Sequence, residues 1–169
     1  MTRAKSLALT PEIKATSLID LGIVAAIYLL PSLTHLLPVP LYLIDPMRLL
    51  LFLTLLTTHR TNSLILAASI PFLSTLFSGH PVFPKNILIA AELSLNVVIF
   101  HWIMSRKESV VVAGMVSILS AKLFYYLLKF GFITLGILGG LLITTPLGYQ
   151  LIPVAVLPVL LRAIQHFKE

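Results

Sequence analysis

Long apolar runs follow one another along almost the whole chain, and they limit its possible folds more than any other feature. Of its 169 residues, 58% are hydrophobic and only 11% are charged, whereas soluble domains are about one quarter charged. A water-soluble fold of this size has too much surface to hide so much apolar area. The chain is therefore expected to lie in a lipid bilayer, as a single transmembrane domain over residues 1–169.

Segments of about 20 apolar residues are needed to cross roughly 30 Å of hydrocarbon. On this criterion the sequence predicts an all-α bundle of six transmembrane helices. Their approximate ranges are 17–37, 41–56, 62–77, 86–104, 110–128 and 144–164. The apolar region 132–164 is too long for one simple span, and several Gly and Pro residues interrupt it. Its first half is either an extension of the fifth span or a re-entrant piece, so the course of residues 131–150 stays open.

The loop charges predict the orientation of these spans, because Lys and Arg concentrate on the cytoplasmic side. With six crossings, the side that holds both termini carries eight positive residues: Arg3, Lys5, Lys14, Arg60, Arg106, Lys107, Arg162 and Lys168. The opposite side carries only two, Lys85 and Lys129. We therefore expect a multi-pass protein of the plasma (inner) membrane with both termini in the cytoplasm. This orientation also explains the net charge of +6, and no basic stripe with interleaved aromatics indicates nucleic-acid binding.

Several kinds of chemistry lack a sequence signal. The chain has no cysteine, which excludes disulfides and cysteine-bound metals. Its histidines show no His-x-x-x-His spacing, and no phosphate loop or dinucleotide fingerprint occurs. No nucleophile stands beside a base. We therefore expect no metal, no cofactor and no catalytic residue, and we do not expect an enzyme.

Ionisable residues within the spans give the strongest functional signal, since each costs roughly 2.5–3.5 kcal/mol at mid-depth and usually faces the bundle interior. At 1.5 Å of rise per residue, Arg48, Glu92 and Lys122 lie about 9–10 Å below the outer ends of three different spans. Asn96 shares a face with Glu92 at i+4, and Tyr126 and Lys129 follow Lys122 at i+4 and i+7 on one stripe. Together they predict a polar cavity open to the outside, suited to a small polar or zwitterionic ligand that can carry a carboxylate or phosphate.

Loop 78–85 lies above this level, where His80 and Lys85 are expected to help close the site and the loop is the candidate lid. A purely structural interpretation is also open. In it, Glu92 pairs with Lys122 or Arg48, and Asp45 pairs with Arg48. Asp45 and Lys129 are expected near the surface, where they reach water.

Three stretches resemble the substrate-binding S component of energy-coupling factor (ECF) vitamin transporters. Residues 78–85 and 91–96 resemble the third loop and fourth span of that group, and residues 120–126 resemble its fifth span. The residues that carry the resemblance are Ser78-Gly79-His80-Pro81 through Lys85, Ala91-Glu92-Leu93, Asn96, Ser120-Ala121-Lys122, Tyr125 and Tyr126. The length, the six spans and the cytoplasmic termini are also similar.

The resemblance implies a membrane-embedded subunit that captures a water-soluble vitamin or related micronutrient from outside. Such a subunit docks on a transmembrane T subunit driven by two cytoplasmic ATPases. The residues implied to contact or enclose the ligand are Arg48, Glu92, Asn96, Lys122, Tyr126, His80 and Lys85. The family docks through an Ala-xxx-Ala motif on its first span. Here the matching residues are Gly22 and Ala26, which ordinary packing between helices explains equally well.

Two other functions are compatible with the sequence. One is a non-transporting membrane scaffold of the rod-shape type, which binds partner helices and no small molecule. The other is a small intramembrane enzyme or proton-coupled carrier that uses Glu92. The sequence does not name the ligand or give a stoichiometry, nor does it say whether the protein works alone.

Overall fold

The computed structural model describes residues 21–22, 25, 45–79, 81–144 and 146–166. Every regular element within these ranges is a helix. Five longer helices lie within them: α2 (Pro46–Thr57), α3 (Arg60–Ser78), α4 (Phe83–Met104), α5 (Val110–Thr134) and α6 (Leu147–His166). The all-α class predicted from the sequence is confirmed for these residues. The predicted first span, 17–37, lies almost entirely outside them, although residues 21, 22 and 25 are helical.

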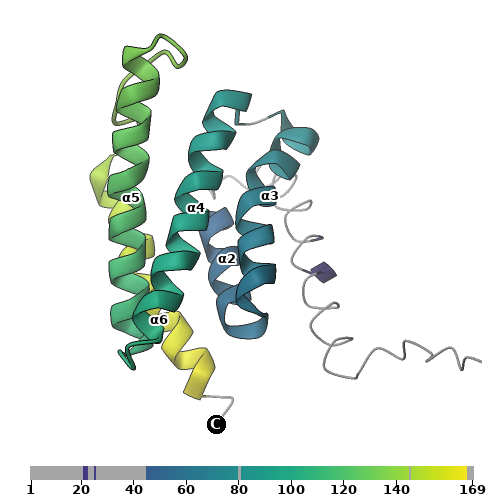
Figure 1. The fold of residues 1–169 in the computed structure, drawn as a ribbon, viewed down its shortest axis with the longest axis vertical. Coiled ribbons are helices and arrows are strands. Elements are labelled where there is room, and N and C mark those ends of the chain that lie inside the picture. The colour runs from purple at the N-terminus through teal and green to yellow at the C-terminus, as the bar shows by residue number, and fades with distance from the viewer. Residues whose placement is uncertain (1–20, 23–24, 26–44, 80, 145, 167–169) are drawn as a thin grey trace, which may run out of the picture.

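The helices pack mainly against their neighbours in sequence. α4 contacts α3 and α5, α5 contacts α6, and α2 contacts α3, α4 and α6. In Figure 1, α3, α4 and α5 stand side by side, and α6 runs back along α5 toward the C-terminal end. The first turns of α2, α4 and α6 therefore lie toward the same end of the bundle as the last turns of α5.

Proline, glycine and serine set several helix ends. Pro46 occupies the first position of α2, where its fixed φ suits a helix and its missing N–H costs nothing. Gly79 ends α3 in the left-handed conformation, with φ 70°, which glycine adopts without steric cost. The hydroxyl of Ser109 accepts a hydrogen bond from the Val112 N–H at 3.2 Å and caps the start of α5.

The observed helices refine the predicted spans. α3, α4 and α6 follow the predicted ranges 62–77, 86–104 and 144–164 closely. α5 continues beyond residue 128 to Thr134, so the start of the uncertain region is an extension of the fifth span. α2 has only 12 residues, a rise of about 18 Å, which is too short to cross the hydrocarbon alone. It begins at Pro46, because Asp45 before it adopts a left-handed conformation with φ 53°.

Two of the described helices, α4 and α5, are long and apolar enough to cross a membrane. The described part of the chain thus supports two spans by length and composition, and it does not support the full bundle of six that the sequence predicts.

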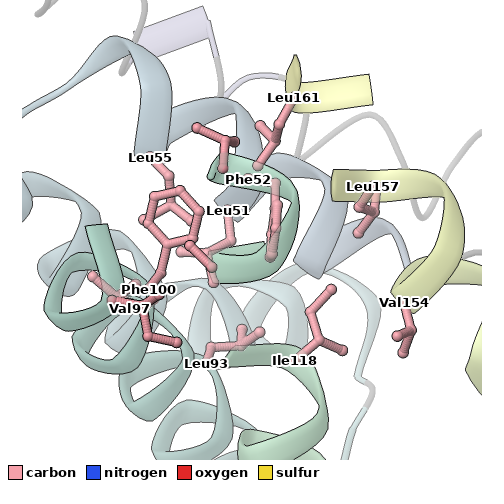
Figure 2. Close-up of a cluster of buried hydrophobic side chains, with 14 residues drawn as sticks. Leu51, Phe52, Leu55, Leu93, Val97, Phe100, Ile118, Val154, Leu157 and Leu161 are labelled. Carbon is pink, nitrogen blue, oxygen red and sulfur yellow. The ribbon is translucent and has the colours of Figure 1, made fainter. Parts of the chain in front are cut away.

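Apolar side chains from α2, α4, α5 and α6, with Ala67 of α3, form the core (Figure 2). The rings of Phe52 and Phe100 meet edge to face with centroids 6.1 Å apart, an arrangement that aromatic pairs prefer. Leu51 and Leu93 belong to this core, and each lies close in sequence to a charged residue, Arg48 and Glu92 respectively. The core therefore fixes the two helices that bring these charges together.

Candidate functional site

A partly open cavity of about 180 Å³ lies at the end of the bundle where α2, α4 and α6 begin. Its wall combines six charged residues with three tyrosines, four apolar residues and two further polar ones. The lining residues are Asp45, Arg48, Lys85, Glu92, Lys122 and Lys129; Tyr125, Tyr126 and Tyr149; Met47, Ile89, Leu93 and Pro153; and Thr144 and Gln150.

Four of the charged residues form one connected cluster. Arg48 donates a hydrogen bond from Nη2 to Glu92 Oε1, which joins α2 to α4. The Lys122 ammonium on α5 lies 3.6 Å from the same Glu92 oxygen and 3.9 Å from Asp45 Oδ2. Arg48 Nε lies 3.4 Å from that Asp45 oxygen. The charges that the sequence places at one level on three helices therefore meet in the structure.

The cluster has a buried side and an accessible side. The side chains of Arg48 and Glu92 are 1% and 5% exposed, whereas those of Asp45 and Lys122 are 28% and 21% exposed. A buried ion pair is favourable only when its remaining polar atoms also find partners. Among the described residues, Arg48 Nε and Nη1 have no hydrogen-bond partner. Arg48 Nη1 is therefore a buried donor without a partner near the wall of the cavity, whereas Nε keeps the Asp45 carboxylate 3.4 Å away.

A second set of contacts closes the cavity between α5 and α6. The Tyr126 hydroxyl donates a hydrogen bond to Gln150 Oε1 at 2.6 Å. The Lys129 ammonium donates one to the Leu142 carbonyl at 2.8 Å. The first bond ties α6 to α5, and the second ties Leu142 to α5. Thr144, two residues after Leu142, lines the cavity.

The connection between α3 and α4 is held by a different network. Asn86 donates a hydrogen bond from Nδ2 to the Thr75 hydroxyl at 2.8 Å, and this hydroxyl donates to the Pro81 carbonyl at 2.5 Å. Of the described residues in the expected lid, 78–85, only Lys85 lines the cavity. This network ties the α3–α4 connection to the end of α3 and the start of α4.

Comparisons of the chain with protein-family models, with curated proteins and with solved structures give no match. The functional assignment therefore rests on the cavity. Within the described residues, no group of three or more His, Asp or Glu side chains is placed to hold a metal ion.

The structure brings together most of the site residues named from the sequence. Those that line the cavity are Arg48, Lys85, Glu92, Lys122 and Tyr126. Asn96 is buried but does not line it. His80 and Ala26 lie outside the described residues, and Gly22 is exposed on a helical segment.

Lys129 lies in the cavity wall, as its i+7 spacing from Lys122 on one stripe of α5 predicts. The expectation that it reaches the surface is wrong, since only 4% of it is exposed. The apolar lining residues, such as Met47 and Ile89, carry no comparable signal.

Asn96 leads to a prediction of its own. It is fully buried, and neither amide atom has a hydrogen-bond partner among the described residues. An unsatisfied buried polar group costs about 1–3 kcal/mol, so Asn96→Leu, which keeps the branch at Cγ, is expected to raise the melting temperature. Solute binding should not change. A marked loss of solute binding in this variant would instead show that Asn96 belongs to the binding site.

Proposed function

We propose that this protein is embedded in a membrane and captures a small water-soluble solute in the cavity between α2, α4, α5 and α6. The observation that carries the proposal is the convergence of Arg48, Glu92 and Lys122 from three helices onto one cavity wall. Ionisable groups held inside an apolar bundle usually mark a solute or ion site.

The outer face of α5 supports the membrane setting. Leu123, Leu127 and Phe130 lie on one stripe of this helix and are 58–65% exposed, whereas Tyr125 and Lys129 are buried. Contact between this exposed apolar stripe and lipid costs no free energy, whereas its contact with water is unfavourable. We propose six spans, of which α4 and α5 are two, in the plasma (inner) membrane. Both termini are cytoplasmic, so the cavity opens to the outside.

Within this setting we propose the role of an S component of an ECF-type importer for a vitamin or related micronutrient. The cavity supplies the capture site, and a T subunit with two cytoplasmic ATPases would supply the driving force. Gly22 is exposed, and among the described residues no heavy atom lies within 4 Å of where its Cβ would be. A partner helix can approach such a position closely.

The polar groups in the cavity wall favour a discriminating site. A site built around buried polar groups rejects analogues that leave those groups without partners, often by several orders of magnitude. A matching solute would pair with lining groups such as Lys122 and Tyr126 and gain affinity from them.

Binding measurements on Lys122→Ala test this proposal. A thermal-shift screen of water-soluble vitamins and related micronutrients would first find a solute that stabilises the purified protein. Truncating one member of a charge pair costs about 2 kcal/mol or more, so the dissociation constant should rise at least about 30-fold. Arg162→Ala, which removes an exposed charge on α6, is the control and should bind normally. Unchanged affinity in Lys122→Ala would refute the site.

A further inference from the structure

The charges of the six ionisable residues that line the cavity do not sum to zero. The carboxylates of Asp45 and Glu92 each lie within 4 Å of both Arg48 and Lys122. These two negative and two positive charges therefore offset one another. Lys85 and Lys129 also line the cavity, and within the described part of the chain neither has an acidic partner at ion-pair distance. The cavity therefore carries two surplus positive charges.

Lys129 is the more constrained of the two. It is 4% exposed, and one bond of its ammonium goes to the Leu142 carbonyl at 2.8 Å. An ammonium has three donors, so two remain available. Lys85 lines the same cavity and is close enough for its charge to act on Lys129. A buried charge without a counter-charge is costly, and two like charges on one cavity increase that cost.

Aromatic and apolar side chains form another part of the cavity wall. The rings of Tyr125 and Tyr126 meet at 77° with centroids 5.4 Å apart, and Met47 and Ile89 add apolar surface to the lining. A cavity of about 150 Å³ with apolar walls can hold benzene. The volume here, about 180 Å³, thus has room for a ring-sized body carrying one polar group.

We infer that the captured solute is a small organic anion. Its carboxylate or phosphate group lies between Lys85 and Lys129, and its ring-sized body packs against Tyr125 and Tyr126. The anion supplies the counter-charge that these two lysines lack. It also accepts hydrogen bonds from the two N–H donors of Lys129 that the Leu142 carbonyl does not use. This inference rests on the proposed solute capture and adds the charge of the ligand and a role for Lys129.

Five simple probes test the inference on the full-length protein in detergent. Benzoate and phenyl phosphate carry an anionic group on a ring, whereas benzamide is neutral and benzylamine is cationic. Inorganic phosphate carries the charge without the ring. We expect benzoate, phenyl phosphate or both to raise the melting temperature, and the stronger of the two identifies the anionic group. Benzamide and benzylamine should have no effect, and inorganic phosphate should bind more weakly than phenyl phosphate.

Charge-removing variants then locate the anion. Lys85→Met and Lys129→Met keep much of the side-chain length and are each expected to weaken anion binding at least about tenfold, which corresponds to about 1.4 kcal/mol. Lys107→Met, at an exposed loop position, should bind as the parent protein does. Without ligand, Lys85→Met should melt at a higher temperature, because one of two like charges is gone. That result does not depend on probe affinity.

The outcomes separate this inference from the proposed function. If benzamide or benzylamine stabilises the protein as well as benzoate does, or if Lys129→Met binds anions normally, the anionic solute is refuted while solute capture stands. If inorganic phosphate binds as tightly as phenyl phosphate, the ring-sized body is refuted. If neither these probes nor any vitamin in the screen binds, both proposals fail together.

Discussion

Replacing Glu92 with glutamine is expected to lower the free energy of unfolding by about 3–5 kcal/mol. Glutamine keeps the size of the side chain but removes the charge that accepts the hydrogen bond from Arg48. Arg48 is 1% exposed and cannot turn to water, so its charge keeps only the partly exposed Asp45 carboxylate, 3.4 Å from Nε. Lys122 loses the carboxylate 3.6 Å away as well. Unfolding in mixed micelles with increasing dodecyl sulfate, followed by circular dichroism, measures this loss.

Two further variants identify the cause. Arg48→Met combined with Glu92→Gln removes both charges, so it should recover much of the stability that Glu92→Gln alone loses. Asp45→Asn alters a carboxylate that is 28% exposed, and the expected loss is only about 0–1 kcal/mol, as for other exposed pairs. If the losses from Arg48→Met and Glu92→Gln simply add, the two side chains do not form the buried pair.

Gly114→Ala is expected to lower the free energy of unfolding by about 1–3 kcal/mol, as overpacking does in other cores. A Cβ at this position would lie 2.9 Å from both Cβ and Cγ of Pro158 and 3.4 Å from a ring carbon of Phe52. The proline ring is fixed to the backbone of α6 and cannot rotate away, so α5 and α6 must separate. Gly114→Leu should have a larger effect and should also weaken solute binding, because α6 carries Tyr149 and Gln150 into the cavity.

Gly131→Ala is the matched control for Gly114→Ala. It lies in the same helix, and no heavy atom lies within 4 Å of where its Cβ would be. Alanine is a better helix former than glycine by about 1 kcal/mol, so this variant should be as stable as the parent or more stable. Equal losses in the two variants would contradict the close approach of α5 to α6. Both are measured by the same unfolding titration.

The sequence predicts the helices well because each apolar run is bounded by residues with strong local preferences. Gly79 and Ser109 mark ends that the structure has within a few residues. The meeting of Arg48, Glu92 and Lys122 is also predictable, since the rise per residue alone places them at one depth.

Other parts of the site depend on backbone geometry that no sequence pattern specifies. The position of Leu142 beside α5 rests on a bond from Lys129 to its main-chain carbonyl, which any residue at that position could supply. The start of α2 at Pro46 depends on the left-handed conformation of Asp45. Asn96 shares a face with Glu92, yet one further turn of α4 takes it beyond the cavity. Identical helical spacing therefore predicts a shared face but not a shared site.

Native mass spectrometry of the protein extracted gently from its own membranes tests solute capture most directly. We expect the protein in the membrane fraction with a small anionic molecule retained, and we expect Lys122→Ala to insert normally but to lose that molecule. A wild-type protein that carries no solute but co-purifies with a membrane partner would contradict solute capture and favour a scaffold role. A protein found in the soluble fraction would contradict the membrane setting itself.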